Sequence, residues 1–285
     1  MSFRSQLPPL SRFTYGTGCV DQPDDPQHVR VVRQAMDAGV WFHSSHVYGD
    51  GRVFQTMKKA FGEDPKRTPK CIFKVDGLGA DLLRDTVRAS IEGTGVARVD
   101  IAQVCGNPDA SVFLPGSAMS DTMIELQEKG LVGNYVLEIF WRGSPHAIES
   151  LRNDRFDAYI FYYNLVNREV SDELFDLLHQ TKANILSLRT LGGGVDSYHG
   201  ATDPEAARLT LEDLYRRSGC RTPLEFRARY VLSDPQVRTT IGGTKNLDHL
   251  ATVIQACENA TPLAAEIVEG VHALHREWFA TKGLW

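Results

Sequence analysis

The chain has 285 residues, of which 42% are hydrophobic and 24% are charged, and its formal net charge is −5. These values are close to the averages of globular proteins, so they exclude a disordered or collagen-like chain. Acidic and basic residues are mixed without a basic block, and we therefore expect no nucleic-acid partner. The sequence contains neither an apolar run of eighteen residues nor a signal-peptide pattern, which predicts a cytoplasmic protein without membrane contact.

The cysteines are odd in number and widely spaced, and no two of them form a C-x-x-C pair. This pattern predicts reduced thiols and favours neither a disulfide framework nor a zinc site. The five residues are Cys19, Cys71, Cys105, Cys220 and Cys257.

Short apolar runs alternate along the chain with longer segments of helical periodicity. The short runs predict strands at 13–16, 40–43, 71–75, 99–104, 133–139, 158–163, 184–188 and 237–241. The longer segments predict helices at 28–38, 53–61, 81–91, 120–130, 146–152, 171–180, 204–218, 223–232, 247–257 and 263–274. In the last of these helices we expect His272 and His275 to lie on the surface.

Eight strands that alternate with helices are typical of a parallel sheet covered by helices. We predict one (β/α)8 TIM barrel that forms a single domain over residues 1–285. A doubly wound open sheet is the alternative. Such a sheet would be expected to carry an early G-x-G-x-x-G motif, but Gly16-Thr17-Gly18 is followed by no suitable third glycine.

The active site of such a barrel lies at the carboxyl ends of its strands. The residues with chemically useful side chains at or just after the predicted strand ends are His43, His46, Tyr48, Lys74, Cys105, Glu138, Trp141, Tyr162 and Arg189. Among these, we expect Tyr48, Lys74, His46 and Cys105 to be catalytic. His43, Glu138, Trp141 and Arg189 are expected to bind a small-molecule substrate.

Lys74 lies within an otherwise apolar strand, where a lysine needs a partner or a lowered pKa. Tyr48 follows the neighbouring strand. A cationic lysine beside a phenol would lower the pKa of the phenol and make it a usable general acid. Arg189 has a planar fork of donors that suits a carboxylate or a phosphate of the substrate.

The segment Gly242-Gly243-Thr244-Lys245 follows the eighth strand and opens a helix. Backbone N–H groups at a helix start suit a phosphate, and glycines permit its close approach. We therefore expect this turn to bind a cofactor. We predict no metal site, because His43 and His46 have no clear carboxylate companion.

Several segments resemble the aldo-keto reductases in order and spacing, and together they cover nearly the whole chain. They are residues 35–42, 47–52, 73–75, 99–104, 163–168, 191–194 and 241–245. The resemblance implies a barrel enzyme that reduces aldehydes and ketones with NADPH. A tyrosine of this family protonates the carbonyl with the help of a lysine, an aspartate and a histidine. By position, Tyr48 and Lys74 keep the first two roles.

The other two positions depart from the family pattern. The aspartate would fall at or next to His43, where no carboxylate stands, and the histidine would fall at Cys105 or Gly106. The cofactor contacts that the resemblance implies have changed as well. Their positions read Glu138, Ile139 and Ile160 for the carboxamide, Arg189 to Leu191 for a Ser-Pro-Leu segment, and Thr252 and Val253 for the adenine.

Three functions therefore stay open. The first is an oxidoreductase that acts on a sugar-like or small carbonyl compound with NADP or NAD. The second is a redox-neutral epimerase, dehydratase or lyase that binds no such cofactor and uses Tyr48, Lys74, His46 and Glu138 as acids and bases. The third is a non-catalytic barrel that binds a ligand. For each of them we expect a monomer or a small homo-oligomer.

Overall fold

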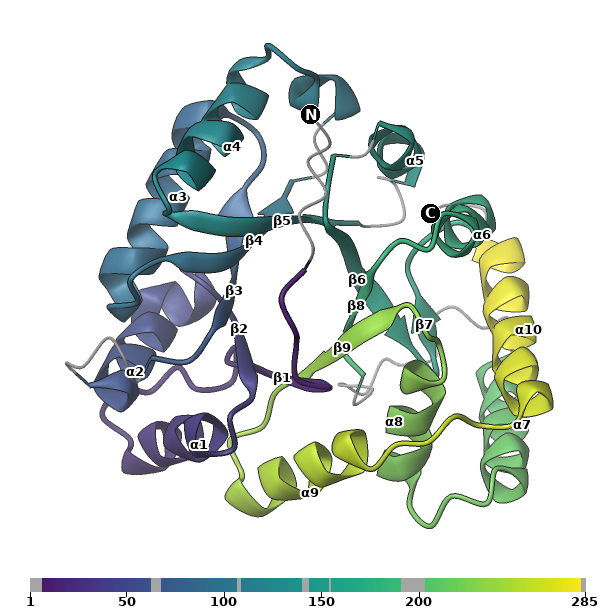
Figure 1. Ribbon diagram of the computed structural model, residues 1–285. Coiled ribbons are helices and arrows are strands. Elements are labelled where there is room, and N and C mark those ends of the chain that lie inside the picture. The colour runs from purple at the N-terminus through teal and green to yellow at the C-terminus, as the bar shows by residue number, and fades with distance from the viewer. Residues whose placement is uncertain are drawn as a thin grey trace.

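The computed structural model describes residues 7–62, 68–106, 109–139, 144–153, 155–190 and 203–282. Its centre is a barrel of eight parallel strands, and helices surround the barrel (Figure 1). The strands are β1 (Phe13–Gly16), β2 (Trp41–Ser45), β3 (Cys71–Asp76), β4 (Val99–Cys105), β5 (Val132–Glu138), β6 (Ala158–Asn164), β8 (Ile185–Leu188) and β9 (Val237–Gly242).

The barrel closes because β1 pairs with both β2 and β9, and β5 pairs with β6. This closure confirms the predicted (β/α)8 TIM barrel and excludes an open doubly wound sheet. A further short strand, β7 (Asn167–Arg168), pairs antiparallel with β6 and was not predicted. It lies just beyond the carboxyl end of β6, outside the barrel itself.

The predicted helices are present in the described part of the chain. They are α1 (Pro26–Asp37), α2 (Arg52–Phe61), α3 (Ala80–Thr94), α4 (Ala118–Glu128), α5 (Ser144–Arg152), α6 (Asp172–Gln180), α7 (Pro204–Arg217), α8 (Pro223–Leu232), α9 (Leu247–Glu258) and α10 (Ala265–Lys282). Short 3-10 turns occur at η1 (Tyr48–Gly51) and η3 (Ala110–Phe113). Among the described residues, no helix is long and apolar enough to cross a membrane.

Capping residues explain where several of these helices begin. The Asp25 side chain accepts a hydrogen bond from the Gln27 backbone, and Pro26 occupies the first turn of α1. The Thr222 side chain caps α8 in the same way, and Pro223 follows it. An oxygen-bearing cap followed by proline satisfies one free N–H group and presets the backbone angle of the first helical residue.

Alternate residues of each strand point into the barrel, which divides its interior into layers. A buried apolar layer contains Trp41, Ile72, Ile101, Val136, Ala158, Ile160, Leu186, Leu188 and Ile241, and Leu7 and Leu10 pack against it. Two residues further along β2 to β5, the positions of the same parity are His43, Lys74, Gln103 and Glu138. The barrel therefore has an apolar floor and a polar layer near the carboxyl ends of its strands.

Two histidines of helix α10 are less exposed than was predicted from the sequence. His275 is fully buried, so its predicted surface position is wrong. It lies four residues after the buried Val271, and this spacing places both side chains on the inner face of α10. The side chain of His272 is 18% exposed, which is also less than a surface position implies.

Candidate active site

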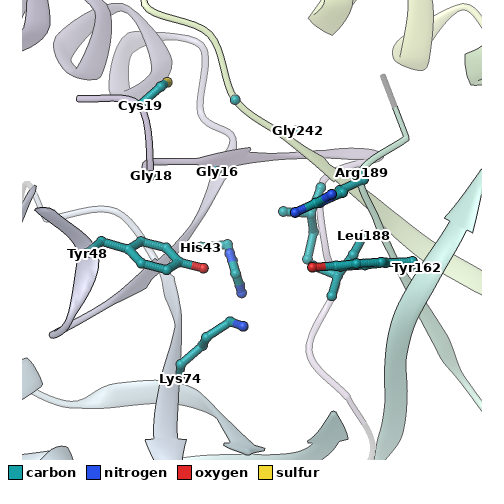
Figure 2. A pocket seen from close by; sticks show the side chains of 12 residues that line it. Gly16, Gly18, Cys19, His43, Tyr48, Lys74, Tyr162, Leu188, Arg189 and Gly242 are labelled. Carbon is teal, nitrogen blue, oxygen red and sulfur yellow. The ribbon is translucent and has the colours of Figure 1, made fainter. Parts of the chain in front are cut away.

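A pocket of about 410 Å³ opens where the strands end (Figure 2). Its lining comes from six strands and the loops that follow them. The lining residues are Gly16, Gly18, Cys19, His43, Tyr48, Lys74, Tyr162, Leu188, Arg189, Ile241, Gly242 and Gly243. This location agrees with the general rule for TIM barrels, in which the strand ends carry the chemistry.

Tyr48, Lys74 and His43 point their polar ends toward the same part of the pocket (Figure 2). Tyr48 is the first residue of the turn η1, and the next residue, Gly49, has the backbone conformation that this turn requires. Gly49 has a φ of 57°, and a Cβ atom added to it would lie 2.6 Å from Cβ of Asp21. Only glycine combines this left-handed backbone with so close a neighbour, so Gly49 helps to fix the position of Tyr48.

Lys74 forms an ion pair with Glu138, which reaches it from β5. The Lys74 Nζ lies 2.8 Å from Glu138 Oε1, and the two side chains are 24% and 2% exposed. Burial is the largest single cause and would lower the pKa of Lys74, but the charge and hydrogen bond of Glu138, together with Tyr48 and Cys105, raise this pKa above its ordinary value. Lys74 is therefore a cation at neutral pH. It is paired with Glu138 and also lines the pocket.

The pKa of Tyr48 is raised, although Lys74 pulls it down as the sequence analysis expected. Burial is the largest cause of the rise, and the charge of Glu138 adds to it. Lys74 lowers the pKa of the phenol but does not outweigh these two causes. Tyr48 consequently keeps its proton at neutral pH, and its hydroxyl faces the pocket.

His43 is a neutral side chain that lines the pocket. Its Nε2 lies 2.6 Å from Gln103 Oε1, and burial together with the charge of Lys74 lowers its pKa to about 4. The His43 ring centre lies 6.5 Å from that of Tyr48. Gln103 was not predicted as a site residue, although its position two residues after the inward-facing Ile101 could have revealed it.

Two predicted catalytic residues lie outside the pocket lining. The thiol of Cys105 contacts the Gln103 backbone oxygen at 3.4 Å, and burial raises its pKa, so a thiolate is disfavoured. His46 lies on the loop after β2 and is only partly buried. Trp141, which was predicted to bind substrate, lies outside the described residues.

The glycine turn after β9 is packed tightly against the end of β1. A Cβ atom added to Gly243 would lie 2.2 Å from the Gly16 backbone oxygen, so only glycine fits there. Gly242 and Gly243 both line the pocket. A side chain at Gly243 would therefore collide with β1, whatever the pocket binds.

Thr244 and Lys245 continue this turn but do not line the pocket. The Tyr15 hydroxyl donates to the Thr244 backbone oxygen at 2.8 Å, and the Gln27 amide donates to the Lys245 backbone oxygen at 2.9 Å. Asn246 then caps helix α9. Hydrogen bonds from Tyr15 and Gln27 thus fix the backbone of the turn, which connects the pocket edge to the N-terminus of α9.

Arg189 and Tyr162 form the side of the pocket opposite Tyr48 (Figure 2). The guanidinium carbon of Arg189 lies 4.5 Å from the centre of the Tyr162 ring. Arg189 has a φ of 55°, which is uncommon for a residue with a side chain. Tyr162 was predicted to lie at a strand end, without a functional role.

Solved aldo-keto reductases share this fold. The holo form of AKR11C1 from Bacillus halodurans is 18% identical, with a TM-score of 0.75 over 94% of this chain and 93% of that chain. The thermostable aldo-keto reductase Tm1743, solved with the inhibitor epalrestat, is 19% identical, with a TM-score of 0.70 over 94% and 95%. An aldo-keto reductase from Klebsiella pneumoniae, in complex with NADPH, is 15% identical, with a TM-score of 0.70 over 93% and 91%.

No curated protein matches this chain in sequence. The model of the Aldo/keto reductase family, however, matches residues 12–275. This match spans all eight barrel strands and the residues that line the pocket. It confirms the resemblance found in the sequence, and the chain belongs to the aldo/keto reductase family.

Proposed function

We propose that the protein reduces a small carbonyl compound with NADPH or NADH, and that Tyr48 is the proton donor. The observation that carries this proposal is the arrangement of Tyr48 and the Lys74–Glu138 ion pair at one pocket. A protonated phenol beside a fixed cation is the arrangement that a carbonyl reduction needs. Membership of the aldo/keto reductase family supports the same chemistry.

In the proposed reaction the Tyr48 hydroxyl donates its proton to the carbonyl oxygen as a hydride reaches the carbonyl carbon. The C=O double bond becomes a single bond, and the product is an alcohol. The nicotinamide cofactor, when bound, supplies that hydride. Tyr48 is left as a phenolate, which the Lys74 cation stabilises until a proton from solvent restores the phenol.

Glu138 acts in this proposal as a positioning residue for Lys74. The family pattern implies an aspartate near His43, and this chain has no carboxylate there. Glu138 supplies a carboxylate to Lys74 from β5 instead, at 2.8 Å. A buried cation requires such a partner, and the changed position explains how the pocket keeps its lysine charged without the aspartate.

The residues after β9 fit the phosphate groups of a dinucleotide. Gly242 and Gly243 line the pocket, and the turn continues through Lys245 into the N-terminus of α9. The positive end of a helix and a lysine both favour a phosphate. We infer that Gly242 to Lys245 would hold the cofactor phosphates.

The positions that would hold the nicotinamide end differ from the family pattern. Glu138 and Ile160 are two of the positions where the resemblance implies a contact with the carboxamide. Glu138 is paired with Lys74, and Ile160 is fully buried in the apolar layer of the barrel. Neither side chain is among those that line the pocket. We therefore assign the carboxamide to neither of them.

A titration of the purified protein with NADPH and NADP⁺, followed by tryptophan fluorescence or calorimetry, tests the proposal. We expect micromolar binding of at least one of them and NADPH oxidation with some members of an aldehyde and ketone panel. The Tyr48→Phe variant should bind the cofactor but lose turnover. Tyr215→Phe, a matched change on helix α7, should keep both.

Absence of binding at millimolar cofactor would contradict the proposal. Proton exchange next to a carbonyl in D₂O without cofactor, if it were lost in Tyr48→Phe, would favour a redox-neutral enzyme instead. Ligand binding without either activity would favour a non-catalytic barrel.

A further inference from the structure

Among the described side chains that line the pocket, one positive charge has no negative partner. Lys74 is neutralised by Glu138, which lies 2.8 Å away. His43 is uncharged at neutral pH, because burial and the nearby Lys74 lower its pKa to about 4. Among the described residues, no carboxylate lines the pocket. Arg189 is therefore the one charge at this surface that the described side chains leave uncompensated.

The geometry of Arg189 leaves its hydrogen-bond donors available. Its guanidinium carbon lies 4.5 Å from the centre of the Tyr162 ring. This cation–π contact holds the guanidinium but provides no negative charge and no carboxylate acceptor. Within the described part of the chain, no ion pair of Arg189 with a carboxylate is found. A guanidinium has five N–H donors and no acceptor, and a carboxylate matches two of them at once.

The backbone of Arg189 points to the same role. Its φ of 55° lies in the left-handed region, where glycine is favoured and a side chain causes strain. Strained residues of this kind cluster at ligand sites, because surrounding structure must hold them in place. Arg189 directly follows β8, whose last residue Leu188 also lines the pocket. This position presents the side chain of Arg189 across the pocket from Tyr48 (Figure 2).

We propose that the substrate is a small carbonyl compound with a carboxylate group, which Arg189 binds while the carbonyl group lies at Tyr48. This inference rests on the proposed reductase function and adds its substrate class. The pocket has a volume of about 410 Å³, and Arg189 and Tyr48 lie on opposite sides of it. Tyr162 holds the guanidinium at the pocket wall, so the acid group and the carbonyl group contact opposite sides.

Turnover of a matched substrate pair tests the proposal. We would measure kcat/KM with NADPH for 4-carboxybenzaldehyde and for 4-methylbenzaldehyde, which differ mainly in charge. The wild-type enzyme should prefer the acid. Arg189→Gln should lower kcat/KM for the acid by roughly 10- to 100-fold, the loss expected for hydrogen bonds to a charged group, and leave the neutral aldehyde within about threefold. Arg189→Lys should recover part of the loss.

Arg30→Gln is the matched control, because Arg30 is exposed on helix α1, away from the pocket lining. A second arm needs no turnover. Benzoate and benzamide would be titrated by calorimetry into the wild-type protein and into Arg189→Gln. We expect benzoate to bind at least tenfold more tightly than benzamide to the wild type, and this preference should disappear in the variant.

The two arms separate the two proposals. If benzoate binds through Arg189 but no aldehyde is reduced, the acid site is supported and the reductase function fails. If the two aldehydes are reduced equally well, or benzoate has no preference over benzamide, the acid site is overturned. It is also overturned if Arg189→Gln weakens NADPH binding and slows both aldehydes equally, because Arg189 would then serve the cofactor phosphates.

Discussion

The polar layer at the barrel mouth and a second polar cluster beneath helix α10 contain the same kinds of side chain in different settings. The second cluster, called the α10 cluster here, consists of Tyr163, Tyr230, His272 and His275. Tyr163 Oη lies 3.3 Å from His272 Nε2, and Tyr230 Oη lies 3.5 Å from His275 Nδ1. Both regions therefore place tyrosine hydroxyls beside other ionisable groups.

Burial shifts the pKa values in both regions in the same directions. It raises the pKa of Tyr163 and of Tyr230, and it lowers that of His275, as it raises the pKa of Tyr48 and lowers that of His43. The difference lies in access and charge. The mouth borders a pocket and holds the Lys74–Glu138 ion pair, whereas the α10 cluster contributes no residue to that pocket.

A shifted pKa therefore does not by itself separate a reacting group from a structural one in this barrel. The pocket makes that distinction, since only a group that a substrate can reach contributes to chemistry. We expect substitutions at the mouth to affect activity and substitutions in the α10 cluster to affect stability.

The largest expected effect is that of Tyr48→Phe. Removal of the proposed proton donor should lower kcat by about 10² to 10⁴-fold and leave the fold intact. Tyr230→Phe, which removes a hydroxyl from the α10 cluster, should keep kcat and lower the free energy of unfolding by about 1 kcal/mol. Steady-state kinetics and urea unfolding measure both. Equal losses of activity in the two variants would contradict the division between the regions.

The ion pair should couple activity to stability. Lys74→Met leaves Glu138 buried without its partner and should destabilise the protein by about 3 kcal/mol and lower kcat, by less than Tyr48→Phe does. The double variant Lys74→Met with Glu138→Gln should regain most of the stability but none of the activity. Urea unfolding of the two single variants and the double variant measures the coupling. A double variant as unstable as the sum of the singles would refute a direct interaction.

A smaller effect is expected from Gly49→Ala. The added Cβ would meet Asp21 at 2.6 Å in a left-handed backbone, so the turn that carries Tyr48 must shift. We expect a loss of about 1 kcal/mol in stability and about tenfold in kcat/KM. Gly39→Ala is the control, because Gly39 has a φ of 69° and nothing within 4 Å. It should lose similar stability and no activity, and matching activity losses would argue against a role for the turn.

The smallest expected effect is a pH dependence of stability that arises from His275. Burial, followed by the charge of Arg168, lowers its pKa well below the ordinary value of 6.5. As pH falls from 6.5 to 5.5, the unfolded chain takes up a proton at this position and the folded chain does not, so stability falls by about 1 kcal/mol. His43 and His272 act in the same direction.

The contribution of His179 to the pH dependence of stability has the opposite sign. Burial alone would lower the pKa of His179, but Asp234 at 2.9 Å raises it. Its contribution is present below pH 6.5 and is lost as pH rises through the raised pKa. Urea unfolding at pH 7.5, 6.5 and 5.5 should show a shallower acid-side loss for His275→Gln than for the wild type. An unchanged slope would mean that His275 is protonated in the folded protein.

The sequence predicted the barrel well because its signal is local and repeated. Each buried strand is a short apolar run, and each helix has an apolar face with a period near 3.6 residues. The caps Asp25 and Thr222 with their following prolines are also local. The antiparallel strand β7 was missed because a two-residue pairing leaves no periodicity to detect.

The candidate site was predictable only in part, because its contacts cross the barrel. Tyr48, Lys74, His43 and Arg189 follow from the strand-end rule, and the structure places all four at the pocket. That Glu138 faces Lys74 depends on the register of β3 to β5 and on which residues point inward. One strand alone does not contain that information. His275 was misplaced for a related reason, since a histidine at the edge of an apolar helical face can lie on either side of it.

The most direct test of the account is a deuterium transfer from cofactor to product. The wild-type protein would be incubated with NADPH that carries deuterium at both C4 positions of the nicotinamide ring and with 4-carboxybenzaldehyde, and the product would be analysed by mass spectrometry. We expect an alcohol with one deuterium on its carbinol carbon. This product should be lost in Tyr48→Phe and kept in Tyr230→Phe. Product formation that continues in Tyr48→Phe, or substrate consumption without deuterium in the product, would contradict the assignment of Tyr48 and its pocket to carbonyl reduction.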